Sequence, residues 1–257
     1  MMDIITCCKV VRDDELIKVN DKQELIIDEV PWKISAYDLN AIEVGKKLAE
    51  KLEGKMQVLT LGSPEALNGT KIQKDILSRG PAELNMVVGE GYEQLDSIST
   101  AWYLAQAITT FENVDLVLCG VGSGDFYNQT VGTQMGTFLN WPNIDNVVEI
   151  EIDESASKAI VKRALEDSTE TYEIPLPAVI TVSSEIIEPS VPTMKEIMRA
   201  GRKPVNLLDL NAESLEQTTE VIEIVVPDQT DRRKEIIEGD GEEEIDQLIE
   251  FLKKELV

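Results

Sequence analysis

The sequence predicts an α/β protein with a parallel sheet in a three-layer arrangement, and two observations support this fold class. Continuous apolar runs are typical of strands buried on both faces, and they lie at Ile4–Val11, Lys55–Leu61, Leu84–Val88 and Val114–Gly120. Segments with helical spacing of apolar residues separate these runs, and this alternation indicates βαβ units. The chain has 257 residues, of which 42% are hydrophobic, enough for a substantial core.

Helices are predicted after Ser35, from Ser63, over Asp96–Phe111 and from about Thr130. Ser63 and Pro64 combine an N-cap with a proline in the first turn, which is a strong start signal. Gly80 and Pro81 provide the matching stop signal. We therefore expect one continuous helix from Ser63 to Arg79.

The second half of the chain changes pattern. Alternating residues predict antiparallel strands with a tight acidic turn at Asp153–Ser157, and they lie at Val147–Ile152, Lys158–Leu165 and Thr171–Ile174. Leu176–Val182 returns to a continuous apolar run and is predicted to be a core strand. Glu24–Asp28 is predicted to be a small edge strand. The parallel sheet therefore gains an antiparallel addition.

A proline-framed loop follows Ser184, and a short helix then carries Met194, Ile197 and Met198 ahead of a basic patch. Methionines adapt their shape to a partner surface, so the segment 185–204 is a candidate for docking. The alternative is that these side chains pack on the core of this chain.

The sequence from Val205 onward is too poor in apolar residues for a second domain. We expect a domain at 1–204 and an arm at 205–257, with a possible strand at Val221–Val226 and a polar stretch at Arg232–Gly241. A final helix is predicted with one apolar face, formed by Ile245, Leu248, Ile249 and Leu252. Such an arm needs another surface to cover this face, either on this domain or on a partner subunit.

The strand at Val114–Gly120 ends in a glycine-rich turn before the helix near Thr130. Free N–H groups and the helix dipole make such a turn a site for anions, and polar side chains suited to a nucleotide follow at Asp125, Tyr127, Asn128, Gln129 and Thr130. The turn matches neither a P-loop nor the usual dinucleotide motif. An ordinary strand-to-helix loop is the alternative.

Three further segments are expected at the same edge of the sheet. The loops after Cys8 and Leu61 follow strands, and Ser35–Asp38 begins a helix. Ligands of parallel sheets bind outside the carboxyl ends of the strands. The sequence therefore predicts a nucleotide-phosphate site with walls from distant segments.

Composition disfavours several classes. The net charge of −25 disfavours a nucleic-acid binder, and no apolar run is long enough for a membrane span or forms a signal peptide. The chain has three cysteines and no histidine, which disfavours a disulfide framework, a zinc site and histidine-dependent nucleophiles, and fits a reducing cytoplasm. Any redox chemistry then needs a bound cofactor.

The stretch Val161–Thr181 (VKRALEDSTETYEIPLPAVIT) carries Arg163, an acidic cluster at Glu166 and Asp167, Glu170 and a P-A-V-I-T strand. With these features the chain resembles the β subunit of electron-transfer flavoproteins. The similarity extends from IITCCKVV through KISAYDLNAIE and LVLCGVGSGDFYNQTVG to MKEIMRAGRKP. KISAYDLNAIE and EIIEGDGEEEI are most similar to the branch called Fix-type or carnitine-pathway.

The resemblance implies a flavodoxin-like or adenine-nucleotide-hydrolase-like domain that pairs with an α subunit carrying FAD. The β subunit of this family holds structural AMP or, in electron-bifurcating members, a second FAD. The positions that the resemblance assigns to the nucleotide are Cys7, Lys9, Ser35, Ala36, Tyr37, Asp38, Leu61, Gly120, Gly122, Ser123, Gly124, Asp125, Tyr127, Asn128, Gln129, Thr130, Val131 and Gly132. The positions expected to bind a dehydrogenase are Pro192, Met194, Ile197 and Met198. No catalytic residue and no metal ligand are expected.

Three departures from the family pattern matter. Ser35-Ala36 replaces the usual Asn-Pro, Val121 and Gly122 replace charged and glutamine residues, and Ile187–Val191 lacks the arginine of the partner loop. The choice between AMP and FAD and the identity of the partner therefore stay open.

The leading hypothesis is a bifurcating redox subunit. Its FAD accepts a hydride from NADH and sends one electron toward ferredoxin and one through the α-subunit FAD to a flavin-dependent dehydrogenase. The second hypothesis is a subunit of a simple electron shuttle with structural AMP. A third is an adenine-nucleotide hydrolase or sensor, and the absence of histidine and of a P-loop lysine argues against hydrolysis.

Overall fold

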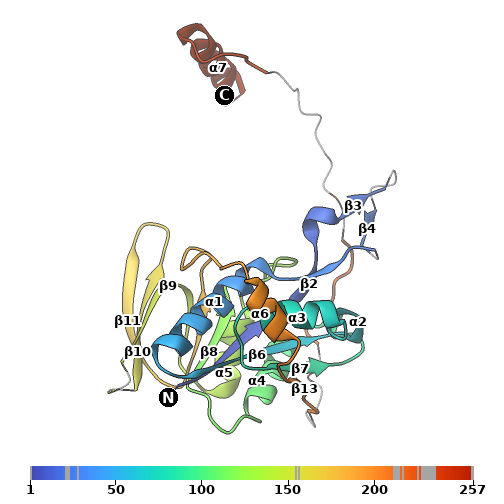
Figure 1. Ribbon diagram of the computed structural model, residues 1–257. Coiled ribbons are helices and arrows are strands. Elements are labelled where there is room, and N and C mark those ends of the chain that lie inside the picture. The colour runs from blue at the N-terminus through green and yellow to red at the C-terminus, as the bar shows by residue number, and fades with distance from the viewer. Residues whose placement is uncertain are drawn as a thin grey trace. The chain divides into compact units, whose positions relative to one another are not determined.

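The computed structural model describes residues 2–20, 24–27, 29–153, 155, 157–210, 215, 217–224, 226 and 236–255. The chain divides into two units, Met1–Ile224 and Val225–Val257, and Figure 1 labels most of their helices and strands. No helix within the described ranges is long and apolar enough to cross a membrane.

The main sheet of the first unit has nine strands within the described residues, in the order β11-β10-β9-β12-β8-β1-β6-β7-β13. Its parallel part comprises β1 (Asp3–Cys8), β6 (Lys55–Gly62), β7 (Leu84–Val88), β8 (Leu116–Gly120), β12 (Ala178–Val182) and β13 (Val205–Leu207). The predicted α/β class with a largely parallel sheet is confirmed.

The antiparallel addition continues the same sheet. β9 (Asn143–Asp153) pairs parallel with β12 and antiparallel with β10 (Lys158–Ala164), which pairs antiparallel with β11 (Thr169–Pro175). β9 therefore joins the two kinds of pairing. The antiparallel strands predicted in this region are confirmed.

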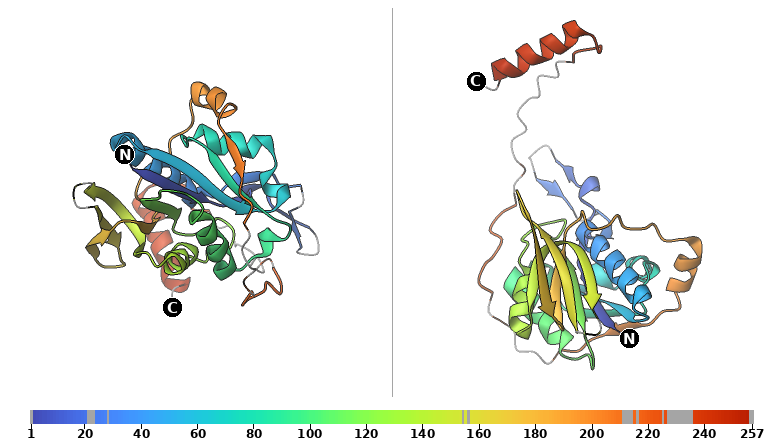
Figure 2. Two further views of the ribbon diagram at one scale, coloured as in Figure 1. Left: turned by 90° about the horizontal axis from the view of Figure 1, so that it is seen from below. Right: turned by 90° about the vertical axis from the view of Figure 1, so that its left-hand side faces the viewer.

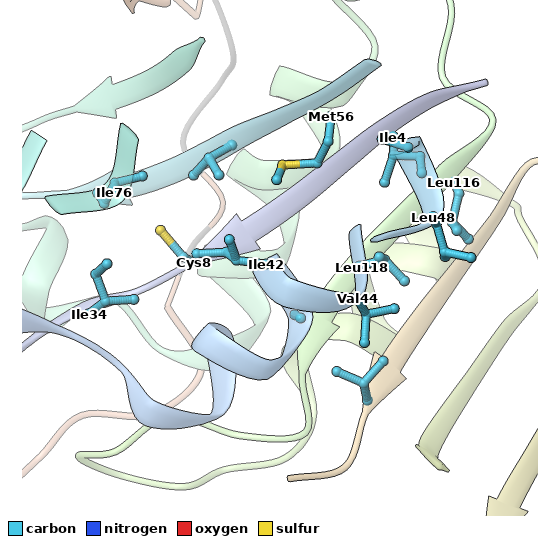
Figure 3. Close-up of a cluster of buried hydrophobic side chains, with 14 of the residues drawn as sticks. Ile4, Cys8, Ile34, Ile42, Val44, Leu48, Met56, Ile76, Leu116 and Leu118 are labelled. Carbon is cyan, nitrogen blue, oxygen red and sulfur yellow. The ribbon is translucent and has the colours of Figure 1, made fainter. Parts of the chain in front are cut away.

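Helices cover both faces of the sheet (Figure 2). One face carries α1 (Ala36–Lys51), α2 (Pro64–Leu67), α3 (Thr70–Ser78) and α6 (Met194–Ala200), and the other carries α4 (Ser97–Ile108) and α5 (Val131–Leu139). Two apolar cores result, one on each face. Figure 3 shows the core beneath α1, where Ile42 and Leu48 face the sheet.

The first predicted strand, Ile4–Val11, is in fact two strands. β1 ends at Cys8, and β2 (Val10–Arg12) pairs antiparallel with β5 (Trp32–Ile34) in a separate sheet. Lys9 interrupts them because its N–H donates to Asp38 Oδ2 at 2.7 Å and its carbonyl accepts from the Ser35 N–H at 2.9 Å. Contacts with α1, invisible in the local pattern, therefore end the strand.

The continuous helix expected from Ser63 to Arg79 is also wrong, because α2 ends at Leu67 and α3 begins at Thr70. Asn68 and Gly69 lie at the break, and Gly69 has an extended backbone. Both residues have low helix propensity. The predicted cap is present, since the Ser63 hydroxyl accepts from the Ala66 N–H at 3.4 Å.

Smaller elements also differ from the prediction. β4 (Leu25–Ile26) pairs with β3 (Lys18–Val19) in a sheet of its own, and Asp28 lies outside the described residues. Residues 221–224 and 226 form no strand, and Val225 is not described. Two short 3-10 helices, η1 (Asp14–Leu16) and η2 (Tyr92–Gln94), complete the first unit.

The second unit contains α7 (Glu242–Glu255), which confirms the predicted final helix. Its first turn is acidic and its last turn is basic, as the helix dipole favours. The apolar residues Ile245, Leu248, Ile249 and Leu252 recur at helical spacing and are 42–52% exposed. Residues 232–235 of the predicted polar stretch lie outside the described residues.

Candidate functional site

The carboxyl ends of β1 and β8 form a topological switch point. From β1 the chain proceeds to β6 and β7 on one side, and it then returns to β8 on the other side of β1. Crevices at such points are where open parallel sheets bind ligands. A cleft of about 900 Å³, with its open mouth included, lies there.

Most residues that the sequence assigned to a nucleotide line this cleft. They are Cys7, Lys9, Asp38, Leu61, Gly120, Gly122, Ser123, Asn128, Gln129, Thr130, Val131 and Gly132. These residues come from β1 and the residue after it, from α1, β6 and β8, and from the loop before α5 and the first turn of α5. The fold thus brings the four predicted segments together.

The other predicted residues, Ser35, Ala36, Tyr37, Gly124, Asp125 and Tyr127, are not among the lining residues. Ser35 lies behind the wall, where its hydroxyl accepts from the Gly124 N–H at 3.3 Å. The ring of Tyr127 packs on that of Tyr37, with centroids 4.8 Å apart. These contacts hold the glycine-rich loop against the start of α1.

Asp125 does not line the cleft, and its hydrogen bonds stabilise the glycine-rich loop. It accepts hydrogen bonds from the Ser123 hydroxyl and the Phe126 N–H, and it pairs with the ammonium of Lys9. Burial raises the pKa of Asp125, but Lys9 and these hydrogen bonds outweigh it, so the pKa lies below its ordinary value. The Lys9–Asp125 ion pair therefore joins the end of β1 to the glycine-rich loop after β8.

Sequence reasoning missed a wall of the cleft. It comes from the loop after β7 and from α4, with Tyr92, Glu93, Leu95, Ser97, Thr100 and Leu104. Val88 ends a parallel strand at the same edge of the sheet, and this signal was available. Cys8, Cys119, Val121 and Phe126 also line the cleft without having been predicted. The aromatic and apolar residues offer a surface for a flat ring.

The start of α5 provides an anion site. Thr130 is its N-cap, and its side chain makes no capping hydrogen bond. Its hydroxyl oxygen is buried and has no hydrogen-bond partner among the described residues. The first N–H groups of a helix also lack partners within the helix. A phosphate in the cleft fits these donors and the positive end of the helix dipole.

Asp38 ties the two strand ends together. Its buried carboxylate accepts from the Lys9 N–H at 2.7 Å and from the Gly120 N–H at 3.1 Å. Burial raises the pKa of Asp38 to about 7, against the opposing effect of these two donors. A Cβ on Gly120 would lie 2.6 Å from the backbone carbon of Tyr37, so glycine is needed for this close approach.

The charged and titratable side chains of the cleft are better suited to binding a ligand than to transferring protons. Lys9 is the one cation among the described lining residues. Burial and neighbouring groups raise the pKa of Cys7 and of Cys8, so both thiols are neutral at pH 7. No group of three or more metal-binding side chains occurs in the described part of the chain. The arrangement can hold and orient a phosphate-bearing ligand with an aromatic ring.

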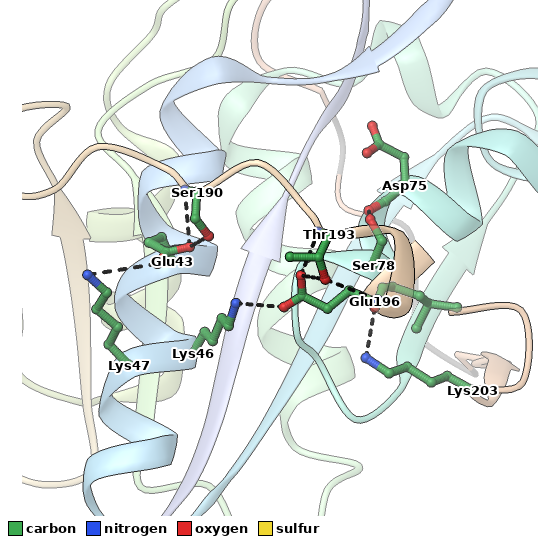
Figure 4. A network of polar contacts seen from close by, with 10 residues as sticks. Glu43, Lys46, Lys47, Asp75, Ser78, Ser190, Thr193, Glu196 and Lys203 are labelled. Atoms are coloured by element: carbon green, nitrogen blue, oxygen red, sulfur yellow. Dashed lines mark hydrogen bonds and ion pairs between the residues drawn. The ribbon is translucent and has the colours of Figure 1, made fainter. Parts of the chain in front are cut away.

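The predicted docking segment lies on the α1 face (Figure 4). Asn40 donates to the carbonyl of Ile187 at 2.6 Å, the Glu43 carboxylate accepts from the Ser190 hydroxyl at 2.7 Å, and Lys46 pairs with Glu196 at 3.2 Å. A capping box between Thr193 and Glu196 begins α6. Polar groups of α1 therefore fix the loop and the helix.

The side chains that this segment presents are strongly exposed. Met194 and Met198 are each 75% exposed, Ile197 is 46% exposed and Pro192 is half-buried. The alternative that the two methionines pack on the core of this chain is therefore wrong. Their role in binding a partner stays a prediction.

Together, the fold and the cleft define an open parallel α/β protein with a candidate nucleotide site at its switch point. The family model described as "Electron transfer flavoprotein domain" matches residues 24–213. This match covers well over half of the sequence, so the chain belongs to the electron transfer flavoprotein domain family. A flavin or nucleotide ligand and a heterodimer partner are general features of that family.

Proposed function

We propose that this chain is the β-type subunit of an electron transfer flavoprotein and that its cleft holds the adenosine-phosphate part of FAD. The buried hydroxyl of Thr130, which has no partner among the described residues, carries this proposal. It lies at the start of a helix and in a cleft at a switch point, where a phosphate supplies the missing acceptor.

The surrounding residues support a nucleotide in particular. Tyr92, Leu95 and Leu104 provide apolar contacts for an adenine ring, while the glycine-rich loop and α5 supply N–H donors for phosphates. Lys9 adds one positive charge. The residues assigned by resemblance that do not line the cleft, among them Ser35 and Tyr127, then support the loop without touching the nucleotide.

The protein's own residues bind and orient the cofactor, and we assign no covalent step to a side chain. A bound FAD supplies hydride acceptance and single-electron transfer. In the proposed cycle NADH is the donor, and ferredoxin and the α-subunit FAD receive one electron each. The exposed methionines of α6 dock a flavin-dependent dehydrogenase, and the arm at 205–257 packs on the α subunit beyond β13, whose residues Val205–Leu207 belong to the main sheet of this chain. The assembly works in the cytoplasm.

The nucleotide content of the full chain co-expressed with its α subunit tests this proposal. The protein is denatured, and the released nucleotides are separated by chromatography and counted per heterodimer. Two FAD and no AMP are expected. One FAD and one AMP would contradict FAD binding here and make this chain a scaffold for its partner's flavin. No adenine nucleotide beyond that of the α subunit would contradict the site itself.

A further inference from the structure

Two cysteines are neighbours at the floor of the cleft. The parallel register of β1 and β8 pairs Thr6 with Leu118, so the next residues, Cys7 and Cys119, lie side by side. The proximity of the Cys119 thiol is the largest cause that raises the pKa of Cys7. Both side chains belong to the core on the α4 and α5 face. Two strands that are far apart in sequence therefore bring together a pair of sulfur atoms.

The spacing of neighbouring strands brings the pair within reach of a disulfide at the Cα atoms. Adjacent strands lie about 4.8 Å apart, within the range of roughly 4.4–6.8 Å that separates the Cα atoms of bridged cysteines, and a bridge also needs the Cβ atoms to approach to about 3.5–4.5 Å. All three cysteines of the chain are free thiols. Cys7 and Cys119 line the cleft and are 5% and 6% exposed, so a small molecule in an open cleft can approach them.

Cys8 provides an internal comparison. It is equally buried and also lines the cleft, but it belongs to the core on the α1 face, where Figure 3 shows it near Ile42. Because strand residues alternate between faces, Cys8 points away from the pair although it directly follows Cys7.

We propose that Cys7 and Cys119 form a dithiol that a hydroperoxide converts into an intramolecular disulfide, and that a nucleotide in the cleft shields the pair. The first part stands on the strand register and the cleft. The second part rests on the proposed function, because shielding requires that the nucleotide occupy this cleft. The site is a redox modification site, and its oxidant is hydrogen peroxide or a small organic hydroperoxide.

The reaction balances with one hydroperoxide per disulfide. One thiol sulfur attacks hydrogen peroxide, the O–O bond breaks, and a sulfenic acid and one water form. The second sulfur then attacks the sulfenic sulfur, the S–S bond forms, and the hydroxyl leaves as a second water with the remaining thiol proton. The two thiols lose two electrons, which reduce the peroxide to two molecules of water.

The surroundings of the pair make this reaction slow at neutral pH. The neighbouring Cys119 thiol raises the pKa of Cys7, and so do burial and the nearby Asp38 and Cys8. The attacking species is the thiolate, so the pair stays reduced in ordinary conditions. Oxidation therefore becomes faster as the pH rises.

The test uses the full chain in its heterodimer, in one sample with its nucleotide and in one from which the nucleotide has been stripped. Both are treated with hydrogen peroxide, remaining thiols are alkylated, and peptide fragmentation by mass spectrometry locates any disulfide. In the stripped protein we expect a Cys7–Cys119 bond. The Cys8→Ala variant should form the same bond, and Cys119→Ala should form none. With nucleotide bound, formation should be at least about tenfold slower because access is blocked.

The possible outcomes separate the two parts of the proposal. No disulfide in the stripped protein, or a Cys7–Cys8 bond, would overturn the dithiol. Equal rates with and without nucleotide would overturn the shielding and count against this cleft as the nucleotide site, while the dithiol would stand. Disulfide mapping of the unmodified protein tests whether Cys7 and Cys119 form a disulfide even if the cysteine variants fail to fold.

Discussion

At the scale of single residues, Thr130 tests the anion site most closely. The hydroxyl of Thr130 is buried without a partner in the described structure, so the nearly isosteric Thr130→Val should leave the nucleotide-free protein as stable as before. It should weaken nucleotide binding about tenfold to a hundredfold, since a hydrogen bond to a charged group contributes roughly 1.5–3 kcal/mol. Nucleotide titration and thermal unfolding measure the two effects.

The control is Thr137→Val on the same helix, because the Thr137 hydroxyl is exposed and donates to the Thr133 carbonyl. It should leave nucleotide affinity unchanged. Equal affinity of Thr130→Val and the unmodified protein would contradict the assignment of the hydroxyl to a phosphate.

Asp38 makes stability depend on pH in a particular direction. Its pKa is 3.8 in a model peptide and about 7 in the folded protein because of burial. The folded state therefore binds more protons between these values, and the contribution of Asp38 to stability is lost as the pH rises through about 7. In Asp38→Asn, the fall in the free energy of unfolding between pH 4 and pH 8 should be smaller by a few kcal/mol. The measurement is the free energy of unfolding at several pH values in this range.

The result is the difference between the pH profiles of unfolding free energy for Asp38→Asn and for the unmodified protein. A difference is needed because other carboxyl groups change the stability in the opposite direction. Glu83, for example, has a pKa lowered by Lys55, and its contribution is lost as the pH falls. Parallel profiles for Asp38→Asn and the unmodified protein would contradict the raised pKa.

At the scale of elements, α6 and its loop are the part most open to a partner. Met194→Glu places a charge on a 75% exposed side chain, so the fold should tolerate it. It should slow electron transfer to the dehydrogenase at least about tenfold through a weaker contact and leave the bound nucleotide in place. The readouts are the rate at limiting dehydrogenase concentration and the nucleotide content.

Leu16→Glu is the matched control, since Leu16 is 51% exposed on η1 and lies outside the segments assigned to the nucleotide or to a partner. An equal effect of Met194→Glu and Leu16→Glu on electron transfer would show that the added charge alone matters. Loss of nucleotide from Met194→Glu would contradict a purely surface role.

The sequence predicted those helices and strands whose apolar residues follow a clear periodic pattern. The buried runs indicated β6, β7 and β8, and the antiparallel region was recognised from its alternation. The three-residue strands β5 and β13 were missed because so short a segment has no readable period and is defined by its pairing partner. The break at Lys9 depends on Asp38, 29 residues later in the chain, and no local pattern reports it.

The same limit applies to the candidate site. The glycine-rich turn and the convergence of strand ends could be predicted, because parallel topology places those loops together. Which side chains enter the cleft could not. Tyr127 and Gln129 have positive φ angles of 49° and 57°, and the loop directs Phe126 into the cleft and Tyr127 toward Tyr37. Such a backbone is unusual for these residues and has no clear sequence signal.

At the scale of the whole molecule, charge is the dominant property. The net charge is −25, from 24 basic and 49 acidic residues, and self-repulsion at this level destabilises a compact state. Raising monovalent salt from low to physiological strength should therefore raise the melting temperature by a few degrees. A fall in melting temperature, measured by calorimetry, would mean that the ion pairs outweigh the repulsion.

Binding of an adenine nucleotide in the cleft at the carboxyl ends of β1 and β8 is central to the proposed function. A crystal structure of the heterodimer with the nucleotides it retains tests this most directly. The account predicts a nucleotide in this cleft, with a phosphate at the start of α5 beside Thr130. A cleft that holds only water, with every nucleotide of the heterodimer bound elsewhere, would contradict it.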